Sequence, residues 1–175
     1  MRRHRSARRV TSVLVVVAGA GLLAGCAGQE QSGTPAQRVS TWVASTGGSG
    51  IGNVEVDSRN VDQALAHHNA PAAIREVCDL LSNDAQSAIG DLPAPDDTLT
   101  NQLNAAYVDA TSAGDDCYNG ASGDTALLAR SAAERVRLAS LLATAVQHIE
   151  SVTGHTPTTN TTQPQGNGDP FGGGT

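Results

Sequence analysis

Residues 71–89, PAAIREVCDLLSNDAQSAI, carry the pattern that decides the fold. Apolar residues follow Ile74 at +3, +4, +7, +11 and +14, which is the spacing of one buried face of an α-helix. Asn69 is placed to cap the start, Pro71 suits the first turn, and Gly90 suits the end. The sequence therefore predicts an amphipathic helix whose apolar face needs a partner.

The segment that follows, residues 96–120, repeats this pattern after a short Pro-containing turn. Apolar residues follow Leu99 at +4, +7, +11, +14 and +18, the last of them being Cys117. An Asp pair beginning at Asp96 places negative charge at the expected N-terminus, and an Asn-Gly pair ending at Gly120 is typical of a helix end. The two segments predict an antiparallel pair of helices.

Two of the three cysteines, Cys78 and Cys117, lie on the apolar faces of these two expected helices. Antiparallel packing brings the start of one helix beside the end of the other, so we expect a Cys78–Cys117 disulfide. Two free core thiols, or a redox or metal-binding pair, are the alternatives. The last has no support from a C-x-x-C spacing or an adjacent His.

The region before this pair contains two weaker helical patterns. Residues 37–45 place Val39, Trp42 and Val43 at helical spacing. The Gly-rich run 47–52 follows, and its composition indicates a flexible connection. A further element is expected to start at Asp57 or Ser58, with inward-facing residues Val61, Ala64, Leu65 and His68.

The longest helix is predicted over residues 124–152, with Arg130 and Glu134 forming an exposed ion pair. The fold class that follows is all-α: a small antiparallel bundle of about four helices with one disulfide, occupying residues 37–153. Residues 26–36 indicate a flexible tether. The Thr-, Pro- and Gly-rich residues 154–175 indicate a disordered tail.

The first 25 residues have the anatomy of a secretory signal peptide. Five of the eleven Arg of the chain fall within the first nine positions, and the mostly apolar run 10–24 follows them. This run is shorter than the approximately twenty residues that a membrane-spanning helix requires. A positive segment, a short apolar segment and small residues at the end are typical of export signals.

The end of this segment, Leu23-Ala24-Gly25-Cys26, resembles the lipobox of bacterial lipoproteins. The resemblance implies that Leu23, Ala24 and Gly25 are recognised by the signal peptidase, and that the Cys26 thiol receives a diacylglycerol before the chain is cut in front of it. A second acyl group on the new N-terminus is also implied. An ordinary signal peptide with an incidental Cys and an uncleaved anchor are the alternatives, and Sec and twin-arginine export both remain open.

The charge distribution argues against nucleic-acid binding. From residue 26 onward, six Arg face seventeen Asp and Glu, and only four aromatic residues are present. Such a chain lacks both the positive field that neutralises phosphates and the rings that stack on bases.

Candidate catalytic, metal and cofactor sites are weak. The run 47–52 lacks the Lys of a phosphate loop and fits no G-x-S-x-G motif. His67 and His68 could bind a metal ion together with Asp62 or Glu55. Adjacent residues on a regular helix point about 100° apart, so the two histidines cannot easily face one ion. One His is therefore expected in solvent and one at the core edge. An acidic group lacks the spacing of a calcium loop and is interpreted as an acidic helix end; its members are Asp109, Asp115 and Asp116. We expect no catalytic residue, metal site or cofactor.

The expected function follows from location more than from chemistry. The chain resembles uncharacterised actinobacterial envelope lipoproteins through Trp42 before a Gly-rich run, Leu92-Pro93-Ala94-Pro95-Asp96 and Cys117-Tyr118. We expect a non-catalytic, membrane-anchored interaction module on the extracytoplasmic face of the cell membrane, with an envelope protein as its partner. The alternatives are a small-ligand or metal carrier and an envelope enzyme. A carrier pocket is expected near Trp42, Tyr107 and Tyr118.

Overall fold

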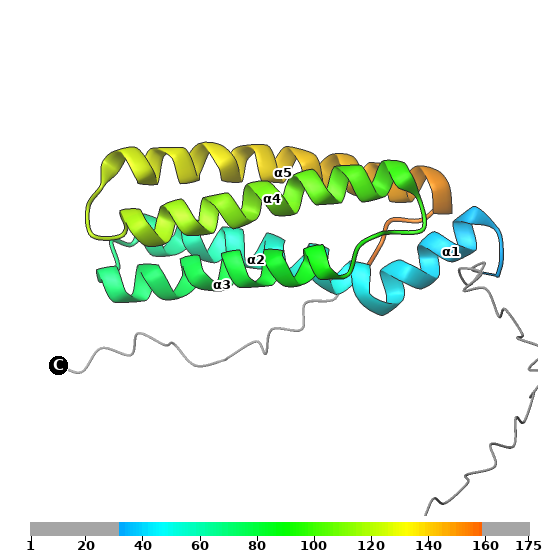
Figure 1. Cartoon of the computed structure of the whole chain (residues 1–175), viewed down its shortest axis with the longest axis horizontal. Coiled ribbons are helices and arrows are strands. Elements are labelled where there is room, and N and C mark those ends of the chain that lie inside the picture. Colours follow the sequence, from blue (N-terminus) through cyan, green and yellow to red (C-terminus); the bar gives the residue numbers. More distant parts are fainter. Residues whose placement is uncertain (1–31, 159–175) are drawn as a thin grey trace, which may run out of the picture. The chain divides into compact units, whose positions relative to one another are not determined.

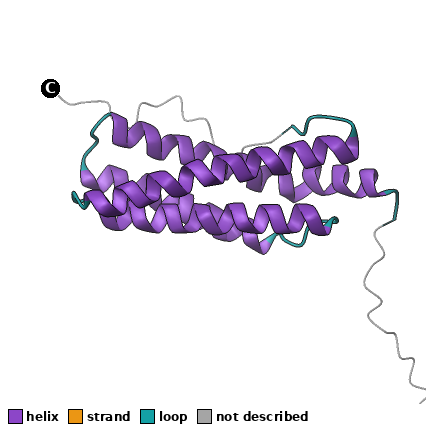
Figure 2. Cartoon of the chain, turned by 90° about the horizontal axis from the view of Figure 1, so that it is seen from above, coloured by secondary structure: helices purple, strands orange, loops and turns teal. Residues whose placement is uncertain are grey.

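The computed structural model describes residues 32–158, and within them every regular element is helical (Figure 1 and Figure 2). One helical run, formed by α1, the π-helical turn η1 and α2, is continuous along the chain, so the domain has four long helical rods. The predicted all-α bundle is confirmed. The elements are α1 (Pro35–Trp42), η1 (Val43–Gly47), α2 (Gly48–Ala66), α3 (Pro71–Gly90), α4 (Asp97–Gly120) and α5 (Thr125–Thr153).

The helices from α2 to α5 alternate in direction, so neighbours in sequence lie antiparallel (Figure 1). The α3 helix packs between α2 and α4, and α4 packs along α5. The α1 helix diverges from the line of α2 and contacts α5. The α2 and α5 helices, the first and last of these four along the chain, make few contacts with each other.

The helix boundaries follow local capping chemistry. Asp96 accepts a hydrogen bond from the Leu99 N–H at the start of α4, and Asp124 accepts from Ala126 and Leu127 at the start of α5. The three helices expected over 71–89, 96–120 and 124–152 are confirmed to within about a residue or two. The expected cap of α3 was wrong: Ala70, not Asn69, occupies the cap position and makes no side-chain bond.

The Gly-rich run 47–52 is helical, so its interpretation as a flexible connection was wrong. A Cβ added to Gly47 would lie 2.1 Å from the Trp42 ring, and one added to Gly48 would lie 2.5 Å from the Val43 carbonyl oxygen. Glycine is therefore required at both positions: the indole of Trp42 lies on the backbone at Gly47, and the Val43 carbonyl of the π-helical turn lies against Gly48. The helix that was expected to start at Asp57 or Ser58 begins ten or so residues earlier.

The centre of the bundle is formed by apolar residues from all four rods. Its largest members with less than 2% exposure include Ile51, Leu81, Leu99, Leu103, Tyr107 and Leu138. The expected disulfide is confirmed: Cys78 and Cys117 are joined, with their Cα atoms 5.7 Å apart. Nearby, α3 and α4 approach so closely that a Cβ on Gly114 would lie 2.7 Å from the Cys78 carbonyl oxygen.

Several predictions fall beyond these residues. The lipobox residues Leu23, Ala24, Gly25 and Cys26 lie outside the described part of the chain, as do residues 159–175. Residues 154–158 have no regular secondary structure, and residues 155–158 line a cavity of about 230 Å³ with α1, η1 and the end of α5. Among the described helices, none has the combination of length and apolar character that crossing a bilayer requires.

Candidate functional site

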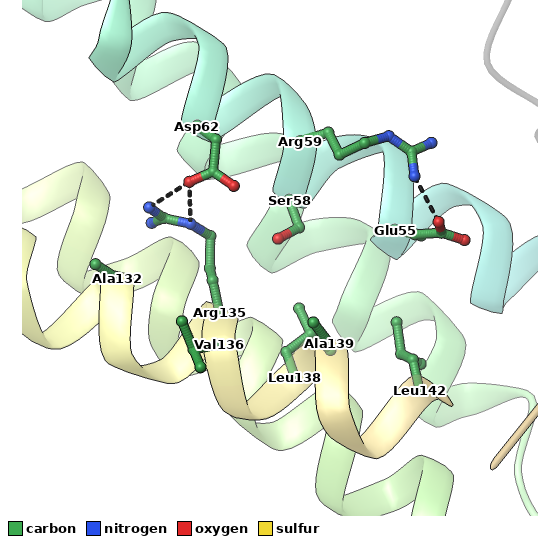
Figure 3. A pocket seen from close by; sticks show the side chains of 10 residues that line it. All are labelled: Glu55, Ser58, Arg59, Asp62, Ala132, Arg135, Val136, Leu138, Ala139 and Leu142. Atoms are coloured by element: carbon green, nitrogen blue, oxygen red, sulfur yellow. Dashed lines mark hydrogen bonds and ion pairs between the residues drawn. The ribbon is translucent and has the colours of Figure 1, made fainter. Parts of the chain in front are cut away.

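A hollow of the described domain lies between α2 and α5, which contact each other at few points (Figure 3). It has a volume of about 420 Å³. We call it the α2–α5 groove, and its lining residues are Glu55, Ser58, Arg59, Asp62, Ala132, Arg135, Val136, Leu138, Ala139 and Leu142.

Arg135 is the buried charge of this groove. Its side chain is only 6% exposed, and its Nε and Nη2 donate to Asp62 Oδ1 over 3.3 and 2.9 Å. Its Nη1 donates to Ser131 Oγ over 2.6 Å. The Ser131 hydroxyl donates in turn to the carbonyl oxygen of Ala113, 2.7 Å away on α4. Arg135 therefore links three helices, α2, α4 and α5.

The ion pair in the groove is asymmetric. Asp62 is 65% exposed, while the guanidinium that it contacts is buried. A buried cation is costly unless it is paired and hydrogen-bonded, so Arg135 depends strongly on an anion at this position. Asp62 supplies the negative charge, and its exposed side chain has room to move toward solvent.

The floor of the groove is apolar and comes from α5. Val136 is 72% exposed, the highest value among the exposed large apolar residues, while Leu138 and Leu142 are buried at its base. The opposite wall, from α2, carries Glu55 and Arg59, which form an exposed ion pair with each other. Figure 3 shows the Asp62–Arg135 pair toward one end, next to Ala132, and Glu55 and Leu142 on opposite sides of the groove toward the other end.

The expected metal candidates have other roles. His67 and His68 are both exposed at the end of α2, so the expectation that one lies at the core edge was wrong. His68 takes a positive φ of 52° in this turn, which directs the chain away from the helix. Glu55 is bound to Arg59 and Asp62 to Arg135, so neither carboxylate is paired with these histidines.

The acidic residues expected at the end of α4 are held by the neighbouring helices. Asp109 pairs with Arg137, and Asp116 forms two hydrogen bonds to Arg130. Asp115 accepts from Ser82 on α3. The expected pairing of Arg130 with Glu134 is absent from the described ion pairs, because Asp116 takes its place. In residues 32–158 no group of three or more His, Cys, Asp or Glu is placed to hold a metal ion.

Glu134 lies beside these pairs on α5. Its side chain is mostly buried, with one carboxylate oxygen 4.0 Å from Arg137. Burial and the nearby charge of Asp116 raise the pKa of Glu134 above its ordinary value.

The three aromatic residues expected near a pocket are separated. Trp42 packs on Gly47, and Tyr107 is a core residue whose burial raises the pKa of its hydroxyl. Tyr118 is 44% exposed, with the Arg75 guanidinium 5.9 Å from its ring centre. Neither of the two cavities described above is lined by any of them.

Sequence reasoning missed the α2–α5 groove, although Arg135 carried a signal. It occupies a position of the inward face of α5, four residues after Ser131 and three before Leu138. A charged residue at such a position indicates either a buried ion pair or a polar site. The divergence of α2 and α5 has no comparable signal in the sequence.

The fold and the α2–α5 groove define a disulfide-linked, four-rod helical bundle with a polar–apolar groove between two of its rods. Comparison with known proteins found no match: no family model, no curated protein and no solved structure is significantly similar to the chain.

Proposed function

We propose that the chain is a bacterial lipoprotein, anchored by lipid on Cys26 to the extracytoplasmic face of the cell membrane. Its helical domain serves there as a non-catalytic interaction module that binds another protein of the cell envelope. The cationic and apolar segments before Leu23-Ala24-Gly25-Cys26 support export and lipid attachment.

The disulfide is the observation that carries this proposal. Structural disulfides form and persist mainly in oxidising compartments outside the cytosol. Cys78 and Cys117 are joined in the core of the bundle, which accounts for two of the three cysteines. The third, Cys26, is the residue at the lipobox position.

The anchor would hold the domain close to the bilayer. Two acyl chains give lasting attachment, whereas one alone binds reversibly. Nine residues from Cys26 to Thr34 precede α1, and such a segment spans at most about 30 Å when fully extended. The start of α1 would therefore lie within about 30 Å of the lipid-bearing residue.

The polar pairs of the bundle support a role without catalysis. His148 bonds to Asp96, and the same carboxylate oxygen caps the start of α4. Ser131 bonds to Arg135 and to the backbone of α4. These groups bridge helices, which is a structural use of side chains that could otherwise serve as acids, bases or nucleophiles.

A small-ligand carrier is the second candidate function, and the α2–α5 groove favours it. Ligand sites are concave, mostly apolar and contain a few placed polar groups, with volumes from about 300 Å³ upward. The groove has an apolar floor, one buried cation and a volume of about 420 Å³.

Metabolic labelling with a radioactive fatty acid tests the anchor. The chain expressed in an actinobacterial host should carry label and sediment with membranes, and Cys26→Ser should lose the label and keep residues 1–25. The matched control is Cys78→Ala with Cys117→Ala, which removes the other two cysteines and should keep the label. Label on the Cys26→Ser chain, or no label on the unaltered chain, would contradict the proposal.

A further inference from the structure

We propose that the α2–α5 groove binds a medium-chain fatty carboxylate, with its head at Arg135 and its chain along the apolar floor of α5. This inference deepens the carrier function given above as the second candidate. It does not require the lipid anchor on Cys26.

The head group is assigned by the chemistry of Arg135. A guanidinium has five N–H donors, and the bonds to Asp62 and Ser131 use three of them. Planar guanidinium groups bind carboxylates through two parallel hydrogen bonds. Because Asp62 is 65% exposed, its carboxylate can turn to solvent while the carboxylate of a ligand takes its place beside the buried cation.

The chain of the ligand is assigned by the floor of the groove. Ala132, Val136, Ala139 and Leu142 line it along α5. The seven helical steps from Arg135 to Leu142 span about 10 Å, so the floor fits an extended aliphatic chain of about eight to ten carbons. An acyl chain laid there would cover Val136, which is 72% exposed. Removing this apolar surface from water favours binding.

Charge sets the orientation of the ligand. Arg135 lies toward one end of the groove, and Glu55 and Leu142 lie on opposite sides of it toward the other end (Figure 3). Glu55 is paired with Arg59, so the second end has no net positive charge to attract an anion. A carboxylate is therefore favoured at the Arg135 end, with the methyl end of the chain toward Leu142.

The test uses the full chain carrying Cys26→Ser, purified without detergent and titrated with decanoate by calorimetry and native mass spectrometry. We expect saturable binding of one decanoate per chain, and binding of the uncharged decanol weaker by about tenfold or more. Binding by this chain does not depend on lipid attachment, so failure of the lipoprotein proposal, which the fatty-acid labelling tests, is distinguished from failure of this inference. Absence of decanoate binding, or equal affinity for decanol, overturns the inference.

Two matched variants locate the site. Val136→Glu places a charge on the floor and should weaken decanoate binding at least about tenfold, whereas Val108→Glu on α4, at another exposed Val, should not change it. Equal losses in both variants overturn the site. A chain that binds no decanoate but forms a dimer that Val136→Glu dissociates assigns the groove to a second copy instead.

Substitution of Asp62, the counterion of Arg135, should change the affinity for decanoate in the opposite direction. Asp62→Asn removes the competing carboxylate and should tighten decanoate binding by about tenfold. Arg135→Met should abolish binding, with Arg137→Met, on the exposed α4 side of the same helix, as its control. If Arg135→Met fails to fold, the Asp62→Asn result still decides, because unchanged or weaker binding overturns the assignment of the head group.

Discussion

The α3–α4 pair and the α2–α5 pair show two ways of joining helices in one small bundle. The first pair is joined by the Cys78–Cys117 disulfide and by an approach at Gly114 that leaves no room for a Cβ. The second pair makes few contacts, has a groove between its helices and is linked by the Asp62–Arg135 ion pair. Close approach of backbones buries surface and excludes ligands, whereas divergence leaves a polar group and apolar residues accessible.

The difference predicts where stability and binding reside. Regions with dense packing and a covalent link open less readily than regions with few apolar contacts. We therefore expect substitutions between α3 and α4 to act on the free energy of unfolding. Substitutions that line the α2–α5 groove should act mainly on binding.

Removal of the disulfide has the largest expected effect. The bridge closes a sequence separation of 39 residues, and the loss of such a loop constraint lowers the free energy of unfolding by about 4 kcal/mol. Cys78→Ala with Cys117→Ala should show this loss in urea unfolding. Reduction of the unaltered chain should give a similar loss, and an unchanged urea midpoint in both cases would show that the α3–α4 pair does not depend on its bridge.

Gly114→Ala tests the close approach of α3 and α4 while both cysteines of the disulfide are kept. The added Cβ would lie 2.7 Å from the Cys78 carbonyl oxygen and 2.7 Å from the Ser82 nitrogen, both of them backbone atoms. We expect a loss of about 2 kcal/mol in urea unfolding, because two helices must move apart. Gly90→Ala is the control: nothing lies within 4 Å of its Cβ, and the helix propensity of Ala should stabilise α3 slightly. Equal effects of the two substitutions would contradict the comparison.

Ser131→Ala tests the polar link at the base of the groove. It removes the acceptor of Arg135 Nη1 and the donor to the Ala113 carbonyl oxygen. Leaving these buried groups unpaired should lower the free energy of unfolding by about 1.5 kcal/mol. Thermal unfolding of Ser140→Ala, an exposed serine of the same helix, provides the reference and should differ little from the unaltered chain.

Substitution of Asp96 should have the smallest effect on the free energy of unfolding, and this effect should depend on pH. The hydrogen bond from the Leu99 N–H, together with the bond to and charge of His148, holds the pKa of Asp96 below its ordinary 3.8. The stabilisation is therefore complete above that pH and is lost as the pH falls through the lower, folded value.

Asp96→Asn keeps a capping side chain and removes the charge. The stability difference between Asp96→Asn and the unaltered chain should shrink as urea unfolding is repeated from pH 6 down to about pH 2. Asp96→Ala removes the cap as well and should cost about 1 kcal/mol at neutral pH. A difference that stays constant across this range would show that the charge of Asp96 does not contribute.

The sequence predicted the α3–α4 half of the molecule well for a local reason. The apolar spacing after Ile74 and Leu99, the Asp caps and the position of each cysteine are short-range signals that agree with one another. Antiparallel geometry then placed Cys78 beside Cys117. No information about distant segments was needed.

The α1–η1–α2 half and the groove depend on tertiary contacts, so the sequence predicted them poorly. Five glycines and serines within residues 47–52 resemble a loop, but the Trp42 ring requires Gly47 inside a helix. In the described domain α1 contacts α5, whereas α2 packs mainly on α3 and contacts α5 at few points, and these contacts join segments far apart in the sequence. Only Arg135, on an otherwise mostly apolar face, marked its position.

Mass spectrometry of the protein isolated from membranes of its natural host is the decisive test of the proposal that the chain is a lipoprotein anchored through Cys26. The account predicts an N-terminal Cys26 that carries a diacylglyceryl group, no residues 1–25, and a linked Cys78–Cys117 pair in the same molecule. An unmodified Cys26 with residues 1–25 still attached would contradict it.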